Sequence, residues 1–358
     1  MVELKESLRE LCLISAISGR EKPVAQAMQR RFSEQGLHAE IDVLGNCMTT
    51  VSGLDTQRPS VMVFGHMDQL GFIVRKIEPD GFLRIERLGG VPERIMPALT
   101  VHVITRQGGF VPGVIGLKAH HATTAEEKTK VRPVGDSYVD IGATCRQEVL
   151  SLGIDIGSAV VYAPRFTELL GGRICATSLD NRVACAVLLA LAEKLKNNPV
   201  DSTVHLVGTV QEEYNVRGAV VAARRNMPAA AICIDVCLDH GTPDMKDLGE
   251  VQLGEGPVLS LYNFHGRGTL NGVIPHEDMV ELFEKASEEQ GIAVQRAVTL
   301  GLLTDLAYVQ FENLGLKAID IGIPCRYTHS PSEICCLSDV EQTVELIYSA
   351  LKLLPCVQ

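Results

Sequence analysis

An apolar stretch that ends in two adjacent acids, Thr203-Val-His-Leu-Val-Gly-Thr-Val-Gln-Glu-Glu213, is the most informative part of this chain. Its apolar residues predict a buried strand, and Glu212 and Glu213 follow where the strand ends. Two neighbours at a strand end can both reach one cleft, although side chains alternate between faces along the strand. Like charges this close repel, and burial adds to the cost unless a cation neutralises them. The pair is therefore either a solvated loop or a site where one carboxylate binds a metal and the other carries protons.

Strands and helices alternate along most of the chain around this stretch. After about residue 163, helices are predicted at residues 181–195, 217–225, 275–290 and 339–354. Strands are predicted between them at residues 203–210, 229–236 and 318–323. This alternation predicts an α/β fold with a mixed, largely parallel sheet and helices on both faces.

A β-rich region interrupts this pattern. Residues 1–68 carry two predicted helices and short strands, whereas residues 69–162 contain runs of alternating apolar residues separated by Gly, Pro and Asp turns. Within the second region, residues 119–135 are polar and rich in Lys and Thr, which indicates a mobile loop. We therefore predict a discontinuous domain of residues 1–68 and 163–358, with a small β-barrel-like domain inserted at residues 69–162.

Composition narrows the functional classes. The 358 residues are 46% apolar and 22% charged, as in an ordinary globular protein. A net charge of −11 disfavours nucleic acid and anionic membranes as partners, and 4% aromatic residues without Trp disfavour a base-stacking platform. The charged first ten residues predict no signal peptide, and no apolar run is long enough to span a bilayer. Eleven scattered cysteines are expected to be reduced, which favours a cytoplasmic location.

Polar residues recur where predicted strands end. His66 and Asp68 follow the apolar run of residues 61–64, Asp235 lies near the end of another strand, and His329 follows a third. Ligands of open α/β sheets bind at the carboxyl ends of strands. These residues and the two acids after residue 210 are therefore expected to lie together.

The candidate metal ligands are two imidazoles and three carboxylates, namely His66, Asp180, Glu213, Asp235 and His329. Such donors suit Zn²⁺, Co²⁺ or Mn²⁺. Five ligands with one shared suit two metals about 3.5–4 Å apart, bridged by a carboxylate and a water. Asp68 would accept a hydrogen bond from the far nitrogen of His66 and fix its tautomer. Glu212 is left as the proton carrier.

Each candidate also has an ordinary structural interpretation. His66 could be a polar end of a strand, Asp180 could cap the helix that follows it, and Asp235 could be a buried hydrogen-bonded acid. His329 lies in a polar loop where exposure is the default. The pair His120-His121 could bind a metal but borders the mobile loop, so we do not include it.

Five collinear motifs resemble those of the M42 aminopeptidases, a family that includes the TET, FrvX-like and glutamyl aminopeptidases. The motifs are Gly65-His-Met-Asp-Gln-Leu-Gly-Phe72, Ser178-Leu-Asp-Asn-Arg-Val183, Gln211-Glu-Glu213 with Arg217-Gly-Ala219, Thr304-Asp305, and Ile323-Pro-Cys-Arg-Tyr-Thr-His-Ser330. The resemblance covers the length of the chain, including the inserted β domain and the Ser18-Gly-Arg-Glu21 turn.

The resemblance implies specific roles. Asp180 would bridge two metals, with His66 and Asp235 completing one site and Glu213 and His329 the other. Glu212 would be the general base and acid, and Asp68 would orient His66. The family also implies a catalytic domain split by a dimerisation domain, and a homo-oligomer built from dimers that can reach twelve subunits. Two departures, Tyr214-Asn215 and Leu302-Leu303, bear on substrate specificity.

We therefore expect a dinuclear aminopeptidase that removes N-terminal residues from peptide substrates, with a bridging water activated by Glu212. A metal-dependent deacylase or amidohydrolase acting on a small amino-acid or carbohydrate derivative is the alternative, because fold and ligands do not settle the substrate. A non-enzymatic binding scaffold is a third possibility, which the filled ligand positions disfavour.

Overall fold

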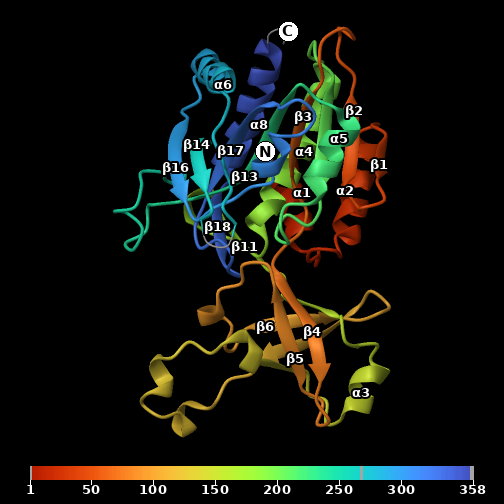
Figure 1. The fold of residues 1–358 in the computed structure, drawn as a ribbon, viewed down its shortest axis with the longest axis vertical. Helices are drawn as coiled ribbons and strands as arrows, with labels where there is room; N and C mark the ends of the chain where they lie inside the picture. The colour runs from red at the N-terminus through yellow and green to blue at the C-terminus, as the bar shows by residue number, and fades with distance from the viewer. Residues whose placement is uncertain (1, 267–268, 355–358) are drawn as a thin grey trace.

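The computed structural model describes residues 2–266 and 269–354, which form a larger α/β part joined to a smaller β part (Figure 1). The chain passes from the α/β part into the β part after β3 and returns before β10. The first and last described helices, α1 (Val2–Cys12) and α8 (Leu337–Leu353), both belong to the α/β part, so the β part is an insertion (Figure 1).

A nine-stranded sheet runs through the α/β part in the order β1-β2-β12-β3-β13-β17-β14-β15, with β16 paired to β14. Its four central strands are parallel: β12 (Val204–Thr209), β3 (Val61–His66), β13 (Ala230–Leu238) and β17 (Lys317–Cys325). The flanking strands are β1 (Ala39–Ile41), β2 (Cys47–Val51), β14 (Val258–Phe264), β15 (Gly272–Val273) and β16 (Gln295–Leu300). The predicted mixed sheet is confirmed, with parallel pairing in its centre and between β14 and β16.

Helices cover both faces of this sheet. One core cluster joins the sheet to α1 (Val2–Cys12), α2 (Lys22–Glu34), α4 (Leu179–Asn197), α6 (Glu277–Gln290) and α8 (Leu337–Leu353). A second cluster on the other face includes α5 (Gly218–Asn226) and α7 (Leu306–Val309). Helix α4 is buried along most of its length because its sequence is apolar on all sides.

The β part is a closed barrel in the order β4-β5-β8-β7-β6-β9. Its strands are β4 (Gly71–Ile77), β5 (Leu83–Leu88), β6 (Thr100–Ile104), β7 (Phe110–Ile115), β8 (Tyr138–Asp140) and β9 (Ala159–Tyr162), and α3 (Arg146–Ser151) precedes β9. Alternate residues such as Phe72 and Val74, or Val101 and Val103, fill the interior. The predicted all-β insertion is thus observed as a closed barrel.

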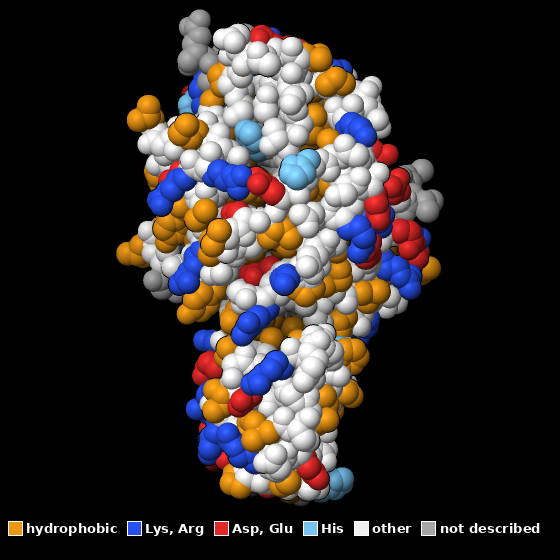
Figure 2. Space-filling view, turned by 90° about the vertical axis from the view of Figure 1, so that its right-hand side faces the viewer, with side chains coloured by type: hydrophobic (Ala, Val, Ile, Leu, Met, Phe, Trp, Pro, Cys, Tyr) orange, Lys and Arg blue, Asp and Glu red, His pale blue; other side chains and the backbone are white. Residues whose placement is uncertain are grey.

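A small three-stranded sheet completes the fold: β10 (Phe166–Glu168), β11 (Arg173–Ala176) and β18 (Glu333–Cys336). No helix in the described ranges combines the length and apolar character needed to cross a bilayer. Figure 2 shows the molecule narrowing from the larger part to the barrel, with basic and acidic side chains intermixed on that face.

Candidate metal centre

The predicted site residues lie at the carboxyl edge of the central parallel strands. His66 is the last residue of β3, and Asp235 lies in the second half of β13. The acidic loop, Gln211–Glu213, follows β12, and His329 follows β17 by four residues. Because β12, β3, β13 and β17 are neighbours and parallel, their ends meet at one edge.

Seven side chains gather there, which we call the cluster: His66, Asp68, Asp180, Glu212, Glu213, Asp235 and His329. The Nε2 atom of His66 lies 3.1 Å from Asp180 Oδ1, 3.8 Å from Glu212 Oε2 and 3.9 Å from Asp235 Oδ1. The Nε2 atom of His329 lies 3.6 Å from Asp180 Oδ2. Three potential ligand atoms, one each from His66, Asp180 and Glu213, all lie within 4.8 Å of one another. Asp180 is therefore the residue on which the others converge.

Both imidazoles are held by backbone carbonyls. The Nδ1 atom of His66 lies 3.1 Å from the carbonyl oxygen of Asp68, and that of His329 lies 3.0 Å from the carbonyl oxygen of Gly90. A carbonyl can only accept, so Nδ1 is the protonated nitrogen in each ring. Each Nε2 lone pair then faces Asp180, which is the arrangement a divalent cation between them requires.

The charge balance of the cluster also calls for a cation. Burial raises the pKa of Glu212 and of Asp235 well above the usual carboxyl range, and neighbouring carboxylates add to both shifts. Burial likewise raises the pKa of Glu213 to about 7. Burial opposes a positive charge on His66, but the surrounding acids outweigh it and raise its pKa well above 6.5. So many buried acids are stable as carboxylates only when cations compensate them.

Two further observations fit bound metal. Glu213 Oε1 is buried without a hydrogen-bond partner among the described residues, as expected of an oxygen that binds a metal ion. Asp180 lies within the non-helical first residues of α4, and its carboxylate faces the histidines and caps no backbone group. The donor set of imidazole nitrogens and carboxylate oxygens therefore fits Zn²⁺, Co²⁺ or Mn²⁺.

Two buried carboxylates, those of Asp68 and Glu21, hold the acidic loop by accepting its backbone N–H groups. Asp68 accepts the backbone N–H groups of Glu212 and Glu213, each at 3.1 Å, and the hydroxyl of Ser18 at 2.5 Å. Glu21 accepts the N–H of Gln211 at 3.0 Å. Gln211 has a positive φ of 61°, an unusual conformation for a residue other than glycine that these bonds help to maintain.

Asp68 therefore does more than the sequence predicted. The carboxylate Oδ1 of Asp68 lies 3.5 Å from His66 Nδ1. That nitrogen lies closer to the backbone carbonyl oxygen of Asp68. The carboxylate is used mainly to hold the acidic loop. Asp68 thus ties β3 and the loop after β12 into one rigid unit.

Three residues that shape the site were not predicted from the sequence as site residues: Glu333, Glu21 and Gly90. Glu333 accepts the N–H of Asp180 at 3.1 Å and the N–H of His329 at 2.8 Å, and so joins the His329 loop to Asp180, which lies 153 residues before Glu333. Glu21 supports the acidic loop, and its only sequence signal was its place in the Ser18–Glu21 turn. Gly90 is the third constraint, because a Cβ there would lie 2.8 Å from the ring of His329.

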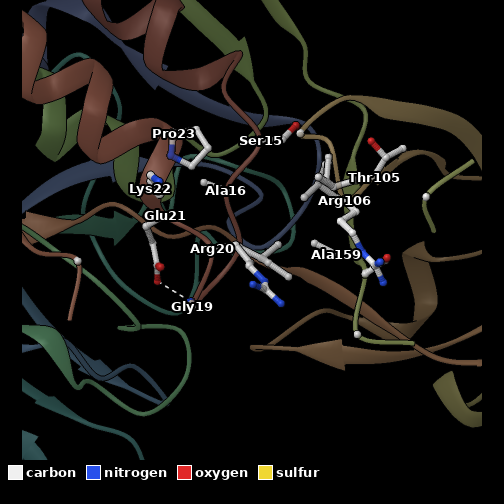
Figure 3. A pocket seen from close by; sticks show the side chains of 18 of the residues that line it. Ser15, Ala16, Gly19, Arg20, Glu21, Lys22, Pro23, Thr105, Arg106 and Ala159 are labelled. Carbon is white, nitrogen blue, oxygen red and sulfur yellow. Dashed lines mark hydrogen bonds between the residues drawn. The ribbon is translucent and has the colours of Figure 1, made fainter. Parts of the chain in front are cut away.

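The other candidate histidines lie elsewhere. His120 and His121 are exposed in a short 3₁₀ turn (His120–Ala122) of the barrel, outside the cluster. A cavity of about 940 Å³ is lined by both parts of the molecule and by none of the cluster residues. Figure 3 shows the Glu21 carboxylate in its wall, bonded to the backbone of Gly19, with the Arg20 side chain directed away from it.

Comparison with known proteins now agrees with this geometry. The family model described as M42 glutamyl aminopeptidase matches residues 45–346. The chain belongs to the M42 peptidase family. It is therefore an enzyme of the aminopeptidase type, a peptide hydrolase.

Relatives of this M42 chain match over nearly its whole length. SgcX of Escherichia coli (strain K12) is 38% identical over 96% of this chain and 92% of its own. The lysyl aminopeptidase of Pyrococcus furiosus is 30% identical, over 87% of this chain and 86% of its own. An aminopeptidase structure from the archaeon Desulfurococcus kamchatkensis superposes with a TM-score of 0.92 at 32% identity, over 98% of this chain and 95% of the other.

Proposed function

We propose that this M42 enzyme is a dinuclear metal-dependent aminopeptidase in which Glu212 transfers the protons. The observation that carries the proposal is the convergence of two Nε2 lone pairs and several buried carboxylates on Asp180. Asp180 would be shared by two metals, His66 and Asp235 would complete one site, and Glu213 and His329 the other. Zn²⁺, Co²⁺ and Mn²⁺ all suit this donor set.

Divalent metals held here would supply Lewis acidity, which lowers the pKa of water and polarises a carbonyl. Glu212 lies beside His66 without being needed as a ligand, so it is free to take a proton from the attacking water. The same carboxyl group can then return that proton to the leaving amine. Asp68 and Glu21 keep Glu212 in place through the backbone of the acidic loop.

A substrate comparison tests the aminopeptidase function. The metal-loaded enzyme should cleave peptide amides with a free α-amine at least about 10²-fold faster than the same compounds acetylated on nitrogen, because only the free amine can bind at the cluster. Rates with matched free and N-acetylated pairs provide the measurement. Equal or faster cleavage of the acetylated compounds would instead indicate a deacylase or amidohydrolase.

We also propose that residues 69–162 form a dimerisation domain inserted into a catalytic domain of residues 1–68 and 163–358. A structural relative supports self-assembly: the Pyrococcus horikoshii TET1 peptidase, 28% identical with a TM-score of 0.85 over 97% of this chain and 98% of its own, can assemble into a tetrahedron or a large octahedral shell. All ten described cysteines are free, which supports a reducing, cytoplasmic location.

Sedimentation velocity tests the assembly proposal. We expect dimers or larger species built from dimers, up to a dodecamer, because an exposed barrel provides a surface for pairing outside the catalytic part. A species that sediments as a monomer at micromolar concentration would contradict the proposal.

A further inference from the structure

A small cavity of about 60 Å³ lies at the cluster and is lined by all five proposed ligands and by Glu212. Beyond the ligands and Glu212, five side chains line it: Val236, Leu238, Leu302, Leu303 and Thr328. A peptide continues outward from the cleaved bond, so its remainder needs an open path. The metals would occupy the part of this cavity between the ligands, and its apolar walls border the space left for the side chain of the amino-terminal residue.

Two of the residues that line the cavity have apolar surface that no hydrophobic core of the described residues covers. Val236 and Leu303 pack against core clusters and are fixed by them. Leu238 and Leu302 are half-buried, yet neither belongs to a hydrophobic core cluster of the described residues. Their free apolar surface faces the cavity, where a ligand side chain could cover it.

The charges around the cavity exclude a charged side chain. No lysine or arginine among the described residues lines it, and two divalent cations would be balanced by the carboxylates of Asp180, Glu212, Glu213 and Asp235, so an acidic side chain would be buried without a free counter-ion. These four carboxylates are themselves needed for metal binding and proton transfer. A basic side chain would therefore find no free partner and would be repelled by bound cations.

The geometry points to an enzyme selective for an uncharged, apolar amino-terminal residue, with Leu302 as a specificity-determining wall. This inference rests on the proposed aminopeptidase function and names its substrate class. It sets this chain apart from relatives named for charged residues, such as the lysyl aminopeptidase of Pyrococcus furiosus.

A panel of Leu-, Met-, Ala-, Glu- and Lys-amides tests the inference on the full-length, metal-loaded protein. We expect kcat/KM for Leu and Met to exceed that for Glu and Lys by at least about 10²-fold, because an unpaired buried charge is costly. Ala should be about 10-fold poorer than Leu, since it covers less of the apolar wall. A preference for Glu or Lys overturns the inference alone. No cleavage of any amide overturns the proposed function as well.

A charge introduced at the wall tests the role of Leu302. Leu302→Lys should raise the ratio of kcat/KM for Glu over Leu by at least about 10-fold, because a cation now faces the cavity. Leu314→Lys is the matched control, since Leu314 is fully exposed and its replacement should leave the ratio unchanged. Metal content and the thermal midpoint show whether the fold is kept. An unchanged ratio in a folded, metal-loaded Leu302→Lys protein overturns the role of Leu302, and Leu302→Met then gives an independent test through the Ala-to-Leu ratio.

Discussion

Glu212→Gln is expected to lower kcat by at least about 10²-fold while leaving the metal content of the protein unchanged. Gln has nearly the same shape but cannot accept a proton from water at neutral pH. The Glu212 side chain has no ligand role in the proposed site, and its backbone N–H remains bonded to Asp68 whatever side chain is present. The acidic loop should therefore keep its conformation. Single-turnover rates and elemental analysis of the same preparation measure the two properties.

The adjacent residue provides the control for this experiment. Glu213→Gln makes the same chemical change one position further along, but it alters a proposed ligand whose Oε1 is buried without a partner. Metal content should fall in that variant together with activity. The proton-transfer role of Glu212 is wrong if the metal-loaded Glu212→Gln protein cleaves its substrate at the wild-type rate.

Asp180→Ala is expected to weaken binding of both metals by at least about 10²-fold and to abolish activity. Asp180 faces the free Nε2 atoms of both histidines, so its loss affects both halves of the site. Removing any other proposed ligand should affect mainly one of the two metals. Metal content after dialysis against a weak chelator measures this difference.

Stability provides a second measurement that does not depend on activity. Bound metal stabilises the folded state by about 2.7 kcal/mol at 100 times its dissociation constant, so chelation should lower the thermal midpoint of the wild-type protein by a few degrees. The same chelation should hardly change Asp180→Ala. Asp247→Ala, at an exposed position, should respond like the wild type. Two tightly bound metals in Asp180→Ala would contradict the shared-ligand assignment.

The sequence predicted the architecture because its signals are local. Continuous apolar runs, such as residues 61–64, marked the buried parallel strands, and amphipathic or fully apolar periods marked the helices. Predicted boundaries differ by only a few residues from those observed; the helix predicted at 275–290 begins at Glu277. The position of His66 also depends on a contact that periodicity does not reveal, because a Cβ at Gly65 would lie 2.4 Å from Ala184 Cβ.

Four of the five candidate ligands stand out in the sequence because each is a histidine or an acid at or shortly after the end of a predicted strand, whereas Asp180 precedes a predicted helix. The same reasoning left His329 as a loop residue that could equally have been exposed. In the structure it is half-buried, with a positive φ of 66°, and its orientation depends on Gly90 and Glu333. Gly90 accepts with its backbone carbonyl, and Glu333 accepts the backbone N–H of His329, so neither contact leaves a residue pattern in the sequence.

By itself, the sequence determined the α/β class, the inserted barrel and the identities of the acids and histidines at the strand ends, since these follow from hydrophobic period and residue chemistry. Only the tertiary structure decided how they are held. Glu21, Asp68 and Glu333 act by accepting backbone N–H groups from distant segments, and every residue type but proline carries such a group. The free surfaces of Leu238 and Leu302 are likewise a tertiary property, because burial depends on what the rest of the chain packs against.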